Sequence, residues 1–331
     1  MNSPRITKFV KYKVKRFIPK SFWFILARYT EEKRKSEFEQ RHVRRASAER
    51  ENRVYVIRRR PPGGGLFSNV NHVLQGIEYA KINQLTPIVD MQNYWTSYSQ
   101  RKSLNNTKNA WEYFFEPVSQ IKIGELDQYK NVIFSKGDRI LPTSPLADLG
   151  LRFVLDSKLL EKYHNLYIEN IRLNKFALYF INRVKDFIDW DHNSIGVSYR
   201  GTDYVSNQPT GHAKQPTLPH LISRLEDKRE KYSNCRLLVS TEDNAAKKKI
   251  INSDFNSVYR EFRDHSTLKK LISNHAPISK QSTDALGYLA EIYLLSECRT
   301  ITSSIANGSA SALVINGGKY SEPDIIDIGN Y

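Results

Sequence analysis

The sequence contains few cysteines and no long hydrophobic run. Cys235 and Cys298 are the only two, 63 positions apart, with no C-x-x-C pair and no histidine at a metal-ligand spacing. A disulfide scaffold and a zinc site are therefore not expected. The longest apolar stretch, FWFILA at 22–27, is far shorter than the roughly 20 residues of a membrane span and is not a signal-peptide core. We expect a protein of the reducing cytoplasm.

Two common nucleotide-binding patterns are also missing. The glycine loop PPGGGLFSN has no glycine at the sixth position of G-x-G-x-x-G, and no G-K-[ST] follows it. A dinucleotide fingerprint and a Walker A loop are thereby excluded.

The positive charge is concentrated at the N-terminus. The 331 residues carry a net charge of +16, and residues 1–60 hold 19 Lys and Arg against six Asp and Glu. In this segment basic residues alternate with Phe, Val, Ile and Trp, and Pro19 divides it. The pattern predicts a basic, helical extension over residues 1–52, with residues 1–50 lying against an anionic membrane surface. A helix packed on the protein's own body and an RNA-binding arm are the alternatives.

The remaining sequence alternates strand-like and helical segments. An apolar strand at 54–59, a glycine loop, a helix with Val70, Val73 and Ile77 at helical spacing, and a strand at 86–91 form a βαβ pattern. A second series begins at 195, with strands expected at 195–200, 235–243, 257–262, 299–304 and 323–329. Such alternation predicts α/β units with parallel sheets. We expect an N-terminal α/β domain over 53–190 and a C-terminal one over 191–331.

Polar residues follow three strands of the second series. These are Arg200, then Thr241 with Asp243, then Ser303 with Ser304. In open α/β sheets, ligands bind outside the carboxyl ends of the strands. A cation, a carboxylate and paired hydroxyls suit a nucleotide diphosphate sugar, because a guanidinium can fork two hydrogen bonds to phosphate. The alternative for Arg200 is a surface ion pair, with Asp203 as its partner.

Two loops and one acidic pair provide further candidates. The loop after Arg200 carries His212 as a possible base and Lys214 as a second phosphate cation. The first glycine loop and helix start provide Gly64, Gly65, Phe67 and Asn69, where glycines allow a ligand to approach the backbone. His72 is interpreted as a packed side chain. Asp189 and Asp191 resemble a metal-binding Asp-x-Asp only superficially and indicate a turn with a packed Trp190.

Several of these stretches resemble one enzyme superfamily. SYRGTDY at 198–204 is similar to the His-x-Arg-Arg-x-Asp-type motif of inverting fucosyltransferases of the α1,6 and protein O-fucosyl groups, which include rhizobial Nod-factor fucosyltransferases. LLVSTED, TITSS and GGGLFSNVNH resemble its other motifs, and GHAKQP and AEIYLLSEC resemble a related group of bacterial surface-polysaccharide glycosyltransferases. The similarity extends in order over about 54–330.

The resemblance implies a GT-B-like fold of two facing Rossmann-like domains, with GDP-fucose as donor and no metal or other cofactor. Arg200 would hold the β-phosphate, Asp243 would lie near the nucleoside, Ser303 and Ser304 near phosphate, and Asn69 in the N-terminal loop. Two positions depart from the pattern: Gly201 replaces the second arginine, and Gln208 falls about where some relatives have a catalytic carboxylate. The base is therefore open between Asp203 and His212, and Lys214 could replace the missing phosphate contact.

These observations predict an inverting, metal-independent glycosyltransferase. It would transfer fucose from GDP-fucose to a bacterial surface polysaccharide, such as lipopolysaccharide or capsule, or to a lipid-linked glycan, on the inner face of the cell membrane. Another nucleotide-sugar donor, a catalytically inactive scaffold and a nucleic-acid-binding protein are the competing hypotheses. No nucleic-acid partner is expected under the leading one.

Overall fold

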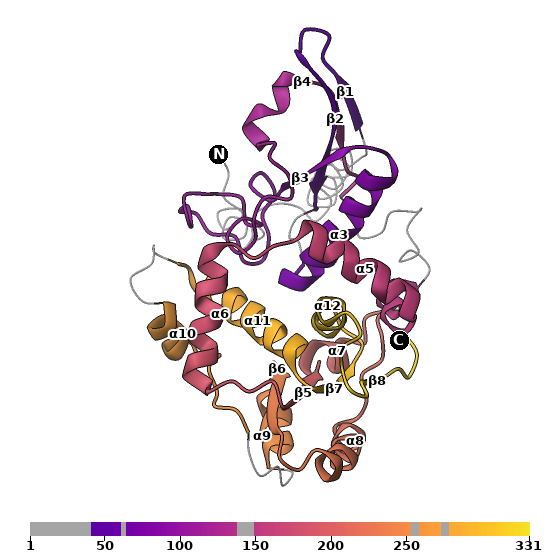
Figure 1. The fold of residues 1–331 in the computed structure, drawn as a ribbon, viewed down its shortest axis with the longest axis vertical. Helices are drawn as coiled ribbons and strands as arrows, with labels where there is room; N and C mark the ends of the chain where they lie inside the picture. The colour runs from indigo at the N-terminus through magenta and orange to yellow at the C-terminus, as the bar shows by residue number, and fades with distance from the viewer. Residues whose placement is uncertain (1–40, 61–63, 138–148, 253–257, 273–277) are drawn as a thin grey trace, which may run out of the picture.

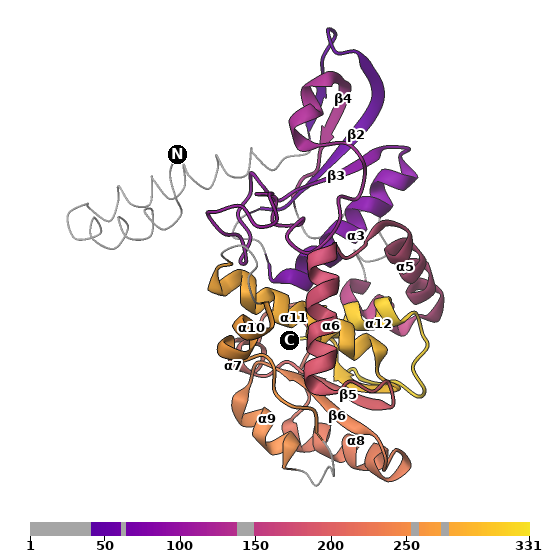
Figure 2. The ribbon, with the colours of Figure 1, turned by 60° about the vertical axis from the view of Figure 1, so that its left-hand side comes forward.

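The computed structural model describes residues 41–60, 64–137, 149–252, 258–272 and 278–331, without the side chain of Asp203. Two sheets lie at opposite ends of the molecule, with helices between them (Figures 1 and 2). The α/β class expected from the sequence is confirmed: parallel strands form the whole second sheet and all of the first except its edge strand β1.

The first sheet has the order β1-β4-β2-β3. Its strands are β1 (Arg41–Arg44), β2 (Arg50–Arg58), β3 (Thr86–Asp90) and β4 (Tyr129–Phe134). β2 pairs in parallel with β3 and β4, and β1 pairs antiparallel with β4. Helix α3 (Leu66–Ile82) makes the crossover between β2 and β3, as the βαβ pattern predicts. It lies so close to the sheet that a Cβ on Gly76 would come within 2.7 Å of the Ile57 side chain.

The predicted helical extension is wrong at its C-terminal end. From Arg41 to Arg44 the chain is already a strand, and β2 begins at Arg50, within the predicted extension. The reason is tertiary: β4, which the sequence analysis did not predict, offers an edge with which β1 pairs. Residues 1–40, including Pro19 and the expected amphipathic helices, lie outside the described residues.

The second sheet is entirely parallel, with the order β6-β5-β7-β8. Its strands are β5 (Ser194–Tyr199), β6 (Arg236–Thr241), β7 (Thr300–Ser304) and β8 (Asp324–Ile326). The helices of this half are α7 (Thr202–Asn207), α8 (Leu218–Lys231), α9 (Asn244–Ile251), α10 (His265–Ile272), α11 (Lys280–Glu297) and α12 (Asn307–Asn316). The strand predicted at 257–262 is wrong, because in its described residues only Val258 makes a bridge, to Leu237.

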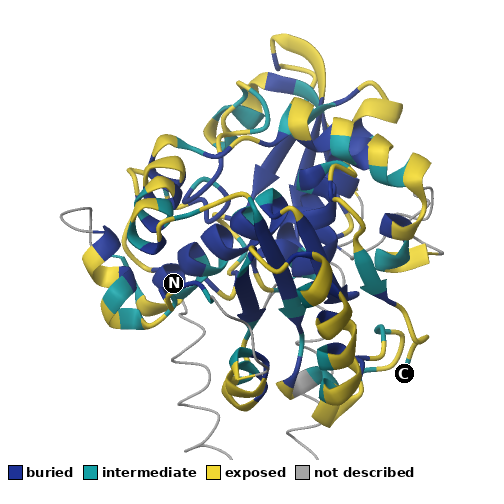
Figure 3. Cartoon of the chain, turned by 60° about the horizontal axis from the view of Figure 1, so that its bottom comes forward, coloured by how far each residue is buried: buried dark blue, intermediate teal, exposed yellow. Residues whose placement is uncertain are grey.

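Alternation along β5 shows how the second sheet is covered. Ile195, Val197 and Tyr199 pack in a cluster with side chains of α8 and α9. On the opposite face a Cβ on Gly196 would come within 2.9 Å of Leu295 of α11. Both faces of the sheet are thus buried, as Figure 3 shows for the strands, which is the usual condition of a parallel sheet.

A layer of helices joins the two sheets. Between β4 and β5 the chain forms the 3₁₀ helix η2 (Gly150–Leu155) and the helices α5 (Ser157–Asn170) and α6 (Lys175–Ile188), whereas the 3₁₀ helix η1 (Ile123–Gln128) directly precedes β4. Helix α5 contacts both α3 and α12, and α6 contacts α11. One continuous apolar cluster therefore includes side chains from both halves of the chain, such as Val73 of α3 and Leu313 of α12. The domain division near residue 190 stays a prediction.

Candidate active site

A cavity of about 320 Å³ opens at the carboxyl ends of β5 and β6. Gly65 and Tyr98 line it from the half that carries the first sheet, and Arg200, Glu242 and Arg263 line it from the other half. We call it the Arg200 cavity. Its position is the one where parallel α/β sheets bind ligands, because the loops that leave the strands converge there.

Arg200 is held at the mouth of this cavity by the end of β5. Its side chain is 36% exposed, and its Nε lies 3.5 Å from Oε1 of Glu242. The guanidinium also lies 5.2 Å from the centre of the Tyr204 ring. Gly201 follows because the backbone passes close to Asp243: a Cβ on Gly201 would come within 2.7 Å of that side chain. The second arginine of the fucosyltransferase motif would therefore not fit at position 201 without displacing the Asp243 side chain.

Arg263 supplies a second cation to the same cavity. Its Nη1 donates a 2.8 Å hydrogen bond to Oε2 of Glu291, whose side chain is only 3% exposed. Burial by itself would lower the pKa of Arg263, but the adjacent Glu291 carboxylate more than offsets this and the pKa is raised. Arg263 is therefore charged at neutral pH.

The sequence analysis missed Arg263, although a usable signal was present. Arg263 comes directly after the strand-like run 257–262, as Arg200 comes directly after the strand at 195–199. The same rule, an arginine at the end of a strand-like run, would have selected both residues.

Tyr288 lies between these charges in the floor of the cavity. Burial raises the pKa of its phenol, Glu291 and Glu242 raise it further, and Arg200 and Arg263 lower it. Phe67 packs edge-on against this ring, with the centroids 5.4 Å apart. Phe67 is buried behind Tyr288 and does not line the cavity.

The residues after β6 have roles different from those expected. Thr241 and Glu242 line the cavity, whereas Asp243 is the N-cap of α9 and accepts hydrogen bonds from the backbone N–H groups of Ala245 and Ala246. Thr241 accepts a hydrogen bond from the N–H of Asp243. In this structure Glu242 presents its carboxylate to Arg200, and Asp243 stabilises the helix start.

Ser303 and Ser304 lie beneath the cavity and do not line it. Both are almost fully buried. Ser304 donates a hydrogen bond to Gln215, and the hydroxyl of Ser303 has no hydrogen-bond partner among the described residues. The chain reaches the Arg200 cavity two residues later, at Ala306. A role for these hydroxyls at phosphate stays a prediction.

The glycine loop meets the Arg200 cavity at Gly65, which caps α3. A Cβ on Gly65 would meet no atom within 4 Å, whereas one on Gly64 would come within 2.7 Å of Ser68 Oγ. Asn69 is fully buried; it accepts a 2.7 Å hydrogen bond from Arg59 and donates one to the carbonyl of Gly64. In this structure Asn69 holds the loop in place.

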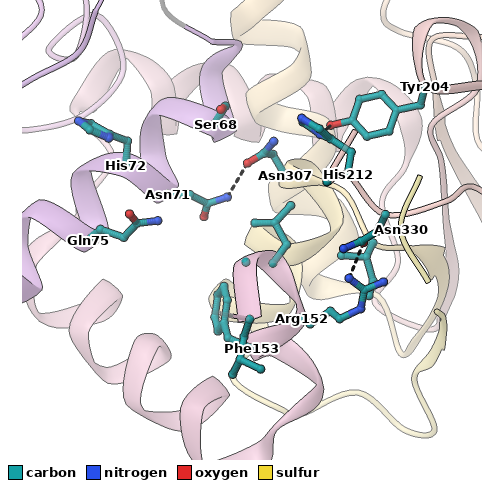
Figure 4. Close-up of a pocket in the computed structure, with 16 residues that line it drawn as sticks. Ser68, Asn71, His72, Gln75, Arg152, Phe153, Tyr204, His212, Asn307 and Asn330 are labelled. Atoms are coloured by element: carbon teal, nitrogen blue, oxygen red, sulfur yellow. Dashed lines mark hydrogen bonds between the residues drawn. The ribbon is translucent and has the colours of Figure 1, made fainter. Parts of the chain in front are cut away.

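A second cavity of about 340 Å³ lies beside the first (Figure 4). Helix α3 contributes Ser68, Asn71, His72 and Gln75, and the opposite wall contains Arg152, Phe153, Tyr204, His212, Asn307 and Asn330. We call it the Gln75 cavity. Nδ1 of His212 is 3.0 Å from the hydroxyl of Tyr204.

Lys214 is absent from the described lining of both cavities. Lys214 is exposed, and its backbone N–H donates to the carbonyl of Gly329. Asp203 belongs to α7, and its side chain lies outside the described part of the chain.

The acidic pair before β5 forms a turn, as expected. Asp189 has a left-handed backbone at the end of α6, and Asp191 accepts a hydrogen bond from the N–H of Asn193. Trp190 packs 4.9 Å from the ring of Tyr259 and donates to Glu297. Among the described residues no group of three His, Cys, Asp or Glu side chains is placed to hold a metal ion. Nor does any helix of that part combine the length and apolarity needed to cross a bilayer.

No family model and no curated protein matches this sequence. Among solved structures, the chain is similar to the Bradyrhizobium alpha-1,6-fucosyltransferase NodZ soaked with GDP-fucose, at 15% identity over 80% of this chain and 93% of that chain, with a TM-score of 0.46. It is also similar to POFUT1 in complex with GDP, at 10% identity over 82% and 98%, with a TM-score of 0.46. A third similar structure is a mutant of Arabidopsis thaliana FUT1 in complex with GDP, at 12% identity over 98% of this chain and 79% of that chain, with a TM-score of 0.48.

Proposed function

We propose that the chain is a glycosyltransferase that uses a nucleotide diphosphate sugar as donor. One observation supports this most directly: Arg200 and Arg263 line one cavity at the carboxyl ends of parallel strands, where the two halves of the chain meet. Each guanidinium can fork hydrogen bonds to pyrophosphate oxygens, and for Arg200 a bound diphosphate would compete with a 3.5 Å contact to Glu242.

In this proposal Arg200 and Arg263 act by electrostatic stabilisation of the leaving group. When the bond from the anomeric carbon to the donor oxygen breaks, negative charge grows on the departing diphosphate. Arg200, at the mouth of the cavity, would stabilise that charge. Glu242 Oε1 lies 3.5 Å from Nε of Arg200 and helps to hold the guanidinium in place. Transfer would proceed with inversion and without a metal, because the two arginines would take the role that a divalent cation has in metal-dependent transferases.

A base must accept the proton of the attacking hydroxyl. His212 is one candidate, since its ring lines the adjacent Gln75 cavity and is oriented by Tyr204. Asp203 of α7 is retained as the alternative. The C-terminal half, 191–331, would bind the donor, and the half from 53 to 190 would contribute the acceptor side.

The identity of the donor and acceptor comes from the motif resemblance. SYRGTDY and the strand-end motifs favour GDP-fucose, and GHAKQP with AEIYLLSEC favours a bacterial surface polysaccharide or a lipid-linked glycan as acceptor. An enzyme with such an acceptor would gain from contact between residues 1–50 and the anionic inner face of the membrane.

The first test is a thermal-shift screen of GDP, UDP, CMP and dTDP and their sugars in the presence of EDTA. A ligand that binds only the native state raises the melting temperature by mass action. We expect GDP and GDP-fucose to stabilise the chain. If only another nucleotide raises the melting temperature, the donor is a sugar of that nucleotide instead of GDP-fucose. If no nucleotide raises it, the proposal is contradicted.

A further inference from the structure

The Gln75 cavity is polar but carries almost no net fixed charge. Its lining consists mainly of amides, hydroxyls and imidazoles from α3, Asn307 and the loops around 212 and 330. Among the described lining residues Arg152 has the only permanently charged side chain, and it is neutralised by a two-pronged pair with Asp327 at 2.8 and 2.6 Å. An anionic ligand would therefore find no unneutralised cation there.

Gln75 points into this cavity from α3 (Figure 4). The residue is 9% exposed, and its Oε1 is buried without a hydrogen-bond partner among the described residues. A buried amide oxygen without a hydrogen-bond partner destabilises a protein, and native structures contain few of them. This oxygen lacks a donor in the described part of the chain, and a ligand hydroxyl would supply one once the Gln75 amide turns to bring Oε1 to the surface of the cavity.

The neighbouring amide is already fixed in position. Asn71, one helical turn before Gln75, donates a 3.1 Å hydrogen bond to Asn307 and accepts one of 3.2 Å from Ser311. Ser68, Asn71, His72 and Gln75 follow the helical spacing that places side chains on one face of α3. The wall of the cavity is thus preorganised around Asn71, and Gln75 contributes an amide oxygen that is still without a hydrogen-bond partner among the described residues.

Apolar surface completes the lining. Leu151, Phe153 and Ile305 face the same cavity. Amide groups beside an apolar surface are suited to a sugar ring, which offers hydroxyl donors and acceptors at its edge and C–H groups on its faces. The near-neutral charge favours a neutral sugar over a uronic or sialic acid.

We propose that the Gln75 cavity binds a neutral sugar ring of the acceptor glycan, with the Gln75 amide hydrogen-bonded to ring hydroxyls. The inference rests on the proposed function and adds the acceptor class to it. The two cavities share no lining residue, yet they adjoin at Tyr204, whose ring lies 5.2 Å from the Arg200 guanidinium and whose hydroxyl contacts His212. An acceptor in the Gln75 cavity would lie next to a donor in the Arg200 cavity.

The test uses the full chain on an array of neutral and acidic glycans in the presence of GDP. We expect binding to neutral glycans, and a loss of affinity of about tenfold in Gln75→Leu, because that variant removes both hydrogen-bonding groups. The matched control is Gln128→Leu, at an exposed position of η1 far from both cavities, which should bind as the parent does. Gln75→Met, closer in shape, replaces the leucine variant if the latter unfolds.

Each other result would overturn the inference. The array could show a preference for acidic glycans or retain no glycan at all. Gln75→Leu could bind glycans as tightly as the parent does, or it could lose affinity for GDP-fucose but not for GDP. In the last case the cavity would hold the donor sugar. A melting-temperature shift with GDP in the same preparations separates the two hypotheses, since its absence contradicts the proposed function and its presence without glycan binding contradicts only the acceptor site.

Discussion

The hydroxyl of Tyr204 lies 3.0 Å from Nδ1 of His212, in the wall of the Gln75 cavity. The same tyrosine ring faces the guanidinium of Arg200 in the adjacent cavity. Tyr204 therefore contacts both the proposed base and the proposed phosphate ligand. This arrangement makes the roles of the two residues separable by mutation.

Tyr204→Phe should affect the base and spare the donor site. The phenylalanine retains a ring beside Arg200 but removes the hydroxyl that orients His212. We expect kcat to fall about tenfold and the pH–rate profile to move, with an unchanged melting-temperature shift by GDP. A profile identical to that of the parent would contradict a base role for His212 and favour Asp203.

Arg200→Ala should fold and lose turnover. Removing one transition-state electrostatic contact reduces kcat by about 100-fold or more. Arg200 is partly exposed and its partner Glu242 is also partly exposed, so the effect on stability should be small. Arg183→Ala is the control, since Arg183 lies on α6, is absent from the described lining of both cavities and donates a hydrogen bond to the exposed Tyr179. Near-normal turnover of Arg200→Ala would contradict the assignment.

Arg263→Met should destabilise the fold as well as the donor site. The substitution leaves the Glu291 carboxylate buried, with Ser240 as a remaining hydrogen-bond donor and with Lys247 as a cation that interacts with it through space. Removing one partner of a buried ion pair costs about 3–5 kcal/mol. In denaturant titrations, Arg263→Met combined with Glu291→Gln should recover part of that loss. Strictly additive effects of the two substitutions would show that the pair is not coupled.

Asp327 should make stability depend on pH in acid. Its hydrogen bonds with Arg152 lower the pKa of the carboxyl in the folded state. A depressed folded pKa contributes stability that is present above the unfolded value of about 3.9 and is lost as pH falls through the folded pKa. The difference in unfolding free energy between the parent and Asp327→Asn should therefore shrink as pH falls below about 4. A difference that stays constant from pH 6 to pH 2 would contradict this linkage.

Gly201→Ala should disturb the start of α9. The added methyl would come within 2.7 Å of the Asp243 side chain, whose Oδ1 caps the helix. Loss of such a cap destabilises a protein by about 1 kcal/mol. Thermal unfolding should show a lower melting temperature than for Gly65→Ala, where the added Cβ meets no atom within 4 Å. Equal melting temperatures would contradict the close contact.

The local alternation of apolar segments was enough to predict much of the fold. β5, β7 and α3 were all expected from the sequence, because each is a short buried element with a regular pattern and a turn after it. Arg200 could be selected for the same reason, since the end of a parallel strand is a position that the sequence indicates. The strand β4 was missed, and residues 257–262 were wrongly expected to form a strand, because pairing with a neighbour decides such short runs.

The sequence by itself determined the two α/β series, the concentration of positive charge before residue 60 and the position of Arg200 at a strand end, since these depend only on residue order. The tertiary structure alone decided which polar side chains reach a cavity. Ser303 and Ser304 are almost fully buried, Asp243 caps a helix, and Arg263 and Gln75 from distant segments line the two cavities. The reason is physical: exposure and hydrogen bonding depend on neighbours that lie far away in the chain, and no local pattern records them.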